Sequence, residues 1–391
     1  MKIVFWIALF IVFYTYIGYG ILLYIIIRLK RLFVGRSHEA VLPADEELPT
    51  MTLMICAYNE EDIVKEKMAN TLALDYPKDK FRIMWVTDGS NDHTNELLAA
   101  YPEVDIVFSP ERRGKTAALK HGLRELKTRY VAFTDANTMI NTGALREIAR
   151  LFSDPTVGCV SGEKRVAARK AGEMASEGEG LYWRYESTLK RWDSELYSAM
   201  GAAGELYAID PQLCREVPDE ALLDDFMLSM YVVQAGKRIA YTSDAYAREY
   251  GSANIYEESK RKRRIAAGGL QSIWWLRSML NPLRQPLVTF QYVSHRVLRW
   301  SITPVAMVLL LIVNIALVAM GAGTFYTVML ILQTLFYLMA LAGWLTNRFG
   351  YKNKLLYTAY YFVFMNFNVF RGMAYLRSHG KSGAWEKAKR S

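Results

Sequence analysis

The chain has 391 residues, of which 52% are hydrophobic and 22% are charged, and its formal net charge is +9. This length suits one large domain or two ordinary ones, and the mixture indicates a water-soluble part joined to membrane segments. The three cysteines are scattered along the chain: Cys56, Cys159 and Cys214. No pair has metal-ligand spacing, which excludes a cysteine metal site. They are predicted to be small buried thiols that a cytosolic location keeps reduced.

The first element is an uncharged apolar run over residues 3–27. A helix needs about 20 apolar residues to cross a bilayer. The run is too long for a cleaved signal peptide, and no small-residue cleavage site follows it. The basic stretch RLKRLFVGR comes next and predicts a cytoplasmic end, with the N-terminus outside. Residues 1–36 are therefore predicted to be a transmembrane helix with its basic stop.

Strand and helix patterns alternate after a polar linker at residues 37–50. The strand patterns lie at 50–58, 81–90, 104–110 and 129–137, and the helix patterns at 59–74, 91–101 and 115–127. Alternation of this kind with apolar strands predicts an α/β domain, placed at residues 45–255, whose parallel sheet is covered by helices.

Polar residues follow these strands at the points where each strand ends. They are Asn59, Glu60, Asp88 and Asp135. Ligands of parallel α/β sheets bind outside the carboxyl ends of the strands. The shared position therefore predicts that these side chains belong to one site.

Two common nucleotide-binding loops are missing from the sequence. The segment RRGKT contains GKT, but no second glycine lies five residues upstream of Gly114, and no G-x-G-x-x-G is present. A P-loop nucleotidase and a nicotinamide enzyme are therefore poor interpretations. The cations of RRGKT stand before a helix, where they suit a diphosphate, although a solvated basic loop has the same pattern.

The acidic strand ends have structural alternatives. Asp88 can accept hydrogen bonds from ribose or base N–H groups, or it can belong to a turn in which Ser90 or Asp92 caps the next helix. Asp135 and Asn137 can form an ordinary turn. They can equally bind Mg²⁺ or Mn²⁺, hard cations that take oxygen ligands alongside substrate phosphates.

Further chemistry is concentrated between residues 181 and 225. Aromatic residues spaced by three or four over 181–192 predict a helix packed in the core or at the membrane, with stacking on an acceptor as the alternative. Small residues at 200–204 allow a ligand to approach the backbone. Asp224 and Asp225 begin a helix and can cap it, or one can act as a general base.

The C-terminal third is basic and then apolar. Residues 256–300 hold nine Lys or Arg and two acidic residues, which fits anionic lipid headgroups or a phosphate ligand better than nucleic acid beside a membrane. Residues 291–300 predict an interfacial amphipathic helix. Residues 301–346 predict a transmembrane hairpin. Residues 355–391 predict a third C-terminal membrane segment, spanning or re-entrant, and a basic tail.

The order of these motifs carries a family resemblance. AYNE, TDGSND, RRGKTAAL, TDAN, GAAGELYAI, LLDDF and KRKRRIAAGG, within about residues 50–270, resemble membrane-embedded inverting family 2 glycosyltransferases such as cellulose, chitin-oligosaccharide and hyaluronan synthases. The resemblance implies a GT-A fold, which is a Rossmann-like mixed sheet with flanking helices, here joined to transmembrane and interfacial helices. It also implies Mg²⁺ or Mn²⁺ as cofactor.

The resemblance implies a role for each matching residue. Asp225 matches the general base, and Asp224 stands beside it where the family has Glu or Asp. The metal would bind Asp135 and Asn137, and the acceptor would pass Gly201 and Gly204. The donor would be held by Tyr58, Glu60, Asp88, Lys115, Asp135, Arg261 and Arg264.

Two departures bear on activity. Asn137 replaces the second acid of D-x-D, which lowers the expected metal affinity while Asp135 remains. In the Q-x-x-R-W motif of the polymerising members, Arg264 is kept, Arg261 replaces Gln, and Ile265 replaces Trp. Loss of that aromatic face argues against long-chain synthesis.

The expected activity is sugar transfer from a nucleotide donor, UDP-linked, to a glycan or lipid-linked acceptor at the cytoplasmic face of the cell membrane. Membrane lipids are expected partners, nucleic acid is not, and a homo-oligomer could widen a narrow channel. The alternative is an inactive glycosyltransferase-fold scaffold or nucleotide sensor. The motifs name neither the sugar nor the acceptor.

Overall fold

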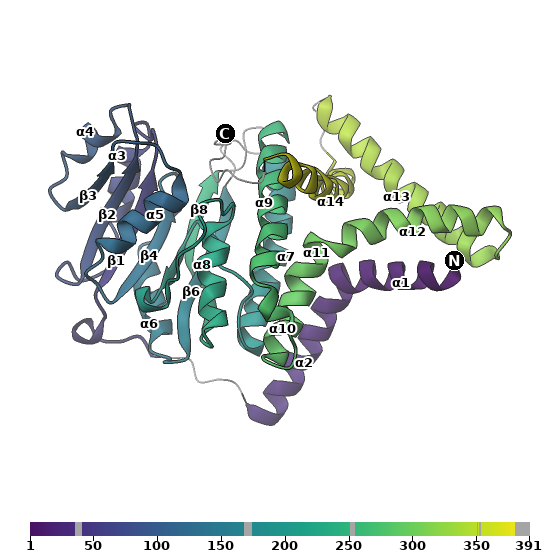
Figure 1. Ribbon diagram of the computed structural model, residues 1–391, viewed down its shortest axis with the longest axis horizontal. Coiled ribbons are helices and arrows are strands. Elements are labelled where there is room, and N and C mark those ends of the chain that lie inside the picture. The colour runs from purple at the N-terminus through teal and green to yellow at the C-terminus, as the bar shows by residue number, and fades with distance from the viewer. Residues whose placement is uncertain (36–40, 168–173, 251–254, 350, 352, 380–391) are drawn as a thin grey trace.

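The structure is a computed structural model that describes residues 1–35, 41–167, 174–250, 255–349, 351 and 353–379. The basic tail expected after residue 379 lies outside this range. A sheet domain occupies one side of the molecule, and a group of long helices extends from it on the other (Figure 1).

The sheet has eight strands in the order β3-β2-β1-β4-β7-β6-β8-β5. The bounds are β1 Met51–Ala57, β2 Phe81–Asp88, β3 Val104–Ser109, β4 Tyr130–Asp135, β5 Met139–Ile140, β6 Val157–Ala167, β7 Tyr207–Ile209 and β8 Arg238–Tyr250. The first four strands are parallel, with Met51 of β1 opposite Phe81 and Tyr130. β7 runs antiparallel between β4 and β6. The mixed α/β sheet expected from the family resemblance is confirmed.

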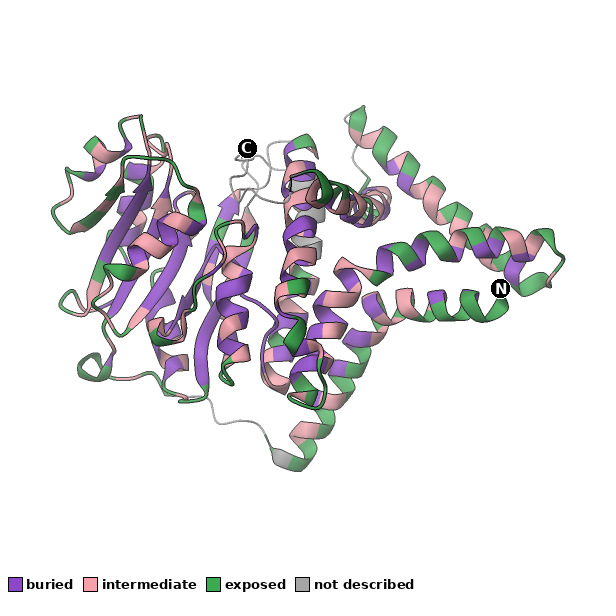
Figure 2. Ribbon diagram, in the orientation of Figure 1, coloured by how far each residue is buried: buried purple, intermediate pink, exposed green. Residues whose placement is uncertain are grey.

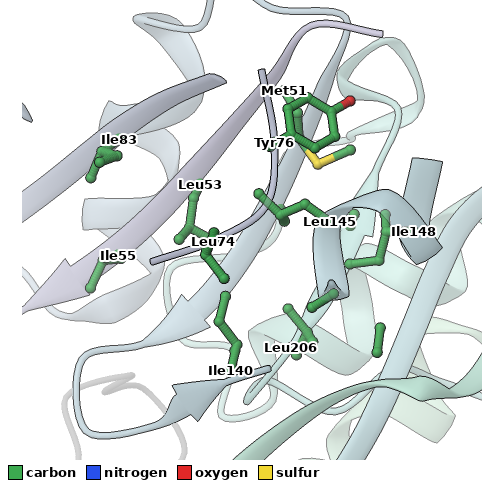
Figure 3. Packing of buried hydrophobic residues seen from close by; sticks show 14 of the residues in the cluster. Met51, Leu53, Ile55, Leu74, Tyr76, Ile83, Ile140, Leu145, Ile148 and Leu206 are labelled. Carbon is green, nitrogen blue, oxygen red and sulfur yellow. The ribbon is translucent and has the colours of Figure 1, made fainter. Parts of the chain in front are cut away.

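Alternating side chains of the strands build two cores, one on each face of the sheet. Leu53 and Ile55 of β1 meet α3 (Val64–Leu72) and α6 (Ala144–Phe152), as Figure 3 shows for part of this cluster. Met54, between them in the chain, faces the opposite way, toward α5 (Lys115–Arg124) and α8 (Asp224–Gln234). Burial on both faces explains why these strands are almost continuously apolar.

The helix expected from residue 59 begins only at Val64, so its predicted N-terminus was wrong. Asn59 has a positive φ of 51°. The backbone N–H groups of the next two residues donate to side chains at the start of α4 (Thr94–Leu98) and in the turn before it. These hydrogen bonds, to Thr94 and Asp92, replace the first helical turn. The acidic residues of NEED therefore lie in a loop that joins two strand ends.

The remaining helices connect the sheet to the apolar part. They are α1 Lys2–Phe13, α2 Tyr19–Val34, α7 Met174–Leu196, α9 Ile255–Trp275, α10 Pro286–Tyr292, α11 Leu298–Trp300, α12 Ile302–Ala319, α13 Thr324–Arg348 and α14 Lys354–His379. A π-helical turn at Tyr14–Gly18 joins α1 to α2. Before this turn, α1 packs against α12. Beyond it, α2 packs against α7, where Tyr19, Leu23 and Ile27 form a cluster with Leu189.

Three of the described helices are long and apolar enough to cross a membrane: Lys2–Phe33, Ile302–Ala319 and Thr324–Arg348. Large parts of these helices are exposed (Figure 2). Large apolar side chains are among their exposed residues, such as Phe10, Ile312 and Leu335. α14 is not among the three. It is one continuous helix, seen nearly end-on in Figure 1, and it contacts both α9 and α13.

The stretch 291–300 differs from the expected surface helix. Its polar side chains are buried, among them His295, Arg296 and Arg299. The reason is that α7 supplies buried carboxylates to this stretch, so its charges face inward.

Candidate active site

A cavity of about 450 Å³ opens where β4 and α8 meet α7, α9 and α14. Its wall brings together seven of the residues predicted from the motifs: Lys115, Asp135, Gly204, Asp224, Asp225, Arg261 and Arg264. Five other predicted residues do not line it: Tyr58, Glu60, Asp88, Asn137 and Gly201. The cavity therefore joins the end of the sheet to the apolar helices.

Lys115 stands at the centre of the charged end. It is the first residue of α5, and its Nζ donates to Asp135 Oδ1 at 2.7 Å and lies 4.0 Å from Asp224 Oδ2. Partial loss of hydration disfavours its ammonium, but the carboxylates of Asp135, Asp224 and Asp225 outweigh that effect and raise the pKa of Lys115 well above its ordinary value. A permanent cation is thus held between the strand end and α8.

Asp225 is the second residue of α8 and lines the same cavity. Burial and the neighbouring charge of Asp224 raise the pKa of Asp225 to about 6. A Cβ at Gly204 would lie 2.9 Å from Asp225 Oδ2, so glycine leaves room beside this carboxylate. A carboxylate with a pKa near the working pH is suited to general base catalysis.

Gly201 does not line the cavity, and its packing against a neighbouring ring explains why a glycine stands there. Its φ is +91°, and a Cβ there would come within 2.2 Å of the ring of Phe226. Its backbone therefore presses against the residue that follows Asp225. Of the two glycines predicted on the acceptor path, only Gly204 faces the cavity.

Asp88 shapes the loop before Lys115. Its buried carboxylate accepts hydrogen bonds from the backbone N–H groups of Arg113 and Gly114, at 2.9 and 2.6 Å. Gly89, with a φ of +67°, is needed because a Cβ would come within 2.5 Å of the Arg112 nitrogen. A direct nucleoside contact by Asp88 stays a prediction; the observed contacts fix the loop that presents Lys115.

Tyr58 and Glu60 follow β1 at the neighbouring strand end. The guanidinium of Arg112 lies 4.0 Å from the ring centroid of Tyr58. The Glu60 backbone N–H donates to Thr94, as described above. Both residues belong to the loops around the sheet edge and outside the cavity, and their donor contacts stay predictions.

Arg261 and Arg264 extend from α9 into the cavity. Arg261 is anchored by ion pairs to Glu205 and Glu258, at 3.7 and 3.6 Å. Glu205 also binds the buried Lys164, which in turn binds Glu249. Burial disfavours the Glu205 carboxylate, but Lys164 and Arg261 lower the pKa of Glu205 overall. The sequence reading missed this network, since its members lie on four separate elements.

A second set of charges was also missed. Glu186 of α7 forms an ion pair with Arg296 at 2.7 Å and accepts a hydrogen bond from Arg299 at 2.9 Å, and it lies 3.2 Å from His295 Nε2. Glu186, Arg296 and Arg299 line the cavity together with Lys190. The spacing of Trp183, Glu186 and Lys190 on one helix face was the only sequence signal for this wall.

A divalent metal fits the charged end only in part. Asp135 supplies one carboxylate toward the cavity, and Asn137 follows two residues later. The described residues contain no group of three or more His, Cys, Asp or Glu that could hold a metal. Mg²⁺ and Mn²⁺ accept such sparse ligation where diphosphate oxygens and waters fill the other positions. The site suits a metal that arrives with a diphosphate.

Comparison with known sequences identifies what the sheet domain is similar to. Residues 52–209 match the family described as Glycosyl transferase family 2. This part of the chain therefore resembles a family 2 glycosyltransferase domain. Strands β2 to β7 lie wholly within this match, as do Lys115 and Asp135. β1 begins one residue before the match, and β8 and α8 with Asp225 lie beyond it.

Two curated relatives have names that concern glycans and glycolipids. A poly-β-1,6-N-acetyl-D-glucosamine synthase of Staphylococcus aureus is 35% identical over 125 residues, which is 31% of this chain and 30% of that protein. A β-monoglucosyldiacylglycerol synthase of Synechocystis is 25% identical over 236 residues, 57% of this chain and 48% of that protein. The similarity thus spans less than half the length of either relative.

A solved structure matches over nearly the whole chain. The mannosyltransferase PcManGT from Pyrobaculum calidifontis, in complex with GDP-Man and Mn²⁺, superposes with a TM-score of 0.68 at 21% identity. The match covers 95% of this chain and 98% of that one. The GT-A-like fold is therefore shared, helices included.

Proposed function

We propose that this chain is an inverting glycosyltransferase that moves a sugar from a nucleotide donor, UDP-linked, to a hydroxyl of a lipid-linked or glycan acceptor. The observation that carries the proposal is one cavity that holds a carboxylate with a raised pKa, a cation between carboxylates, and an apolar end among the long helices. A base, a leaving-group site and an acceptor path are the parts that sugar transfer needs.

Asp225 takes the proton from the acceptor hydroxyl, which attacks C1 of the sugar from the face opposite the diphosphate. That bond forms as the bond from C1 to the diphosphate oxygen breaks, so the configuration at C1 inverts. Lys115 and Arg264 face the negative charge that develops on the diphosphate. A bound Mg²⁺ or Mn²⁺, held by Asp135 and Asn137, would add further charge stabilisation.

The cavity favours short products over a long polymer. Ile265, which stands where polymerising members have Trp, lines the wall, so no aromatic face is offered at this position. Side chains of α14 close the cavity at its apolar end: Thr358, Tyr361, Phe362, Met365, Asn366 and Val369. We infer that one or a few sugars are added to a lipid-linked acceptor.

The proposed location is a cell membrane, with the sheet domain on the cytoplasmic side. Its support is the basic stretch after residue 27, together with the three apolar helices. α14, which runs across the direction of α1 and α12 in Figure 1, is proposed to lie at the membrane interface.

The test is donor turnover by the purified chain in detergent with membrane lipids. Release of nucleoside diphosphate is measured across a panel of UDP-sugars and GDP-mannose, with Mn²⁺ or Mg²⁺ and with a chelator. One donor should be consumed, and the chelator should stop its consumption. Asp225→Asn should lower transfer by about 10²- to 10⁴-fold while nucleotide binding stays unchanged. The exposed Asp79→Asn is the control.

Near-normal turnover by Asp225→Asn would remove the assigned base. Nucleotide binding without transfer to any acceptor, in the presence of lipids, would favour the scaffold or nucleotide-sensor alternative instead.

A further inference from the structure

Lys190 is a buried cation without a partner. Its exposed fraction is 4%, and within the described part of the chain it makes no hydrogen bond or ion pair, yet it lines the cavity. The other buried lysines of the sheet domain behave differently, since Lys67 and Lys164 each bind two partners. A buried ammonium costs free energy unless an anion or acceptor meets it. Lys190 is therefore placed to receive an anion from the cavity.

The groups around Lys190 do not supply that anion. Glu186, one turn earlier on α7, is engaged by Arg296, Arg299 and His295 as described above. Glu205 and Asp225 act on Lys190 only through space, and neither forms an ion pair with it. Burial and the nearby charge of Arg296 lower the pKa of Lys190 to about 8, against the opposing charges of Glu186, Glu205 and Asp225. The ammonium thus remains mostly protonated at neutral pH in a locally cationic wall.

The cavity wall as a whole has a net positive charge. Its wall carries seven cationic side chains against five carboxylates, an excess of two positive charges: Lys115, Lys190, Arg261, Lys262, Arg264, Arg296 and Arg299 against Asp135, Glu186, Glu205, Asp224 and Asp225. The donor diphosphate is proposed to occupy the Lys115 end. Of the cations contributed by α7 and the 293–300 stretch, Arg296 and Arg299 pair with Glu186, and Lys190 remains for a second anion.

The part of the cavity wall formed by α14 is largely apolar. Phe362, Met365 and Val369 of α14 line the cavity, with Tyr16 from the π-helical turn between α1 and α2. This turn belongs to one of the three helices that are apolar enough to cross a membrane, and α14 contacts another of them, α13. A ligand that satisfies both the cationic and the apolar wall has an anionic head and an apolar tail.

We propose that the acceptor is an anionic lipid whose headgroup phosphate binds Lys190, with its acyl chains along α14 and a headgroup hydroxyl directed to Asp225. This assignment rests on the proposed function, because it identifies the acceptor class of the same cavity. Lys190 is thereby a residue that selects a phosphate-bearing lipid over a neutral one.

The test compares lipid binding by the full chain in detergent, using native mass spectrometry. The probes are phosphatidylglycerol, which has a phosphate and free hydroxyls, and diacylglycerol, which has a hydroxyl alone. Phosphatidylglycerol should bind about 10-fold or more tightly, as expected for a buried charge-assisted hydrogen bond. Lys190→Met should abolish the preference. Lys190→Arg should retain it, as should the control Lys65→Met, whose lysine is exposed on α3.

Equal binding of both lipids, or an unchanged preference in a folded Lys190→Met, would overturn the assignment. Displacement of phosphatidylglycerol by inorganic phosphate alone would show a free-anion site and overturn the lipid assignment. Donor binding is measured in the same samples. If the wild-type chain binds neither UDP nor GDP, the proposed function is contradicted. Normal donor turnover without a lipid preference would contradict only this inference.

Discussion

Asp225 has a raised pKa because the half-buried site removes water from its carboxylate and the charge of Asp224 lies nearby. If its carboxylate is the base, the transfer rate should fall about 10-fold per pH unit below about pH 6, where the group is protonated, and level off above it. The measurement is the maximal rate between about pH 5 and pH 8. Asp79→Asn should keep this profile. A rate that stays flat through pH 6 would contradict a titrating base at this position.

Lys67 is buried under the strand end that carries Asp135. Its Nζ donates to Thr134 Oγ1 at 3.1 Å and to the Thr138 carbonyl at 2.6 Å, and Thr138 Oγ1 donates to the Asp135 carbonyl at 2.9 Å. Burial lowers the pKa of Lys67 from 10.5 to about 7. Lys67 therefore supports the turn after β4 from below.

This lowered pKa predicts a pH dependence of stability. Between about pH 7 and 10 the unfolded chain binds more protons at Lys67 than the folded chain, so folding stability rises with pH, by up to about 1.4 kcal/mol per unit. The rise in Tm between about pH 7 and 10 should therefore be smaller in Lys67→Met than in the wild type. Lys65→Met, exposed on the same helix, should keep it. Identical slopes in the wild type and Lys67→Met would refute the assignment.

At the scale of elements, α14 and α9 meet at a glycine. A Cβ at Gly372 would lie 2.8 Å from Ala266 Cβ and from the Ala267 nitrogen, so the two helices pack backbone to backbone. Arg261 and Arg264 line the cavity from the same α9, and α14 contributes much of the apolar part of its wall. Helix contact at this glycine therefore sets the width of the proposed acceptor path.

Gly372→Leu should push α14 away from α9. We expect a loss of stability of about 1–3 kcal/mol and a larger loss of transfer to lipid than of nucleotide binding, because the donor end is formed by other elements. Thermal unfolding, transfer and nucleotide binding are measured on the same preparation. Gly143→Ala, a site with open space and a φ of −84°, should leave all three unchanged. Equal loss of transfer and nucleotide binding would argue against a separate acceptor end.

At the scale of the whole molecule, the N-terminus and the α12–α13 turn lie at the same end of the helical part (Figure 1). Phe5 and Tyr326 are in edge contact, with ring centroids 5.1 Å apart. The basic stretch after residue 27 is expected on the cytoplasmic side of the membrane. The N-terminus and the α12–α13 turn should therefore face the outside of the cell.

A cysteine at Thr324 should therefore react with a membrane-impermeant thiol reagent in intact cells. A cysteine at Lys78, exposed on the sheet domain, should react only after the cells are opened. The labelling is read relative to the unmodified chain, which has three native cysteines. The reverse pattern would invert the proposed orientation.

The sequence alone determined the class of fold, the order of the motifs and the apolar runs. These follow from local patterns, since a buried parallel strand is continuously apolar and a helix that can cross a membrane is long and uncharged. Lys115, Asp135 and Asp225 could be selected in this way, because each stands at a strand end or helix start that the pattern marks.

Only the tertiary structure decided what these residues meet. The ion network of Lys164, Glu205 and Arg261, the inward charges of the 291–300 stretch, and the lone cation Lys190 join segments far apart in the chain. A basic stretch has the same sequence whether it faces water or a buried carboxylate. Its direction depends on which helix packs against it, and that is a property of the assembled fold.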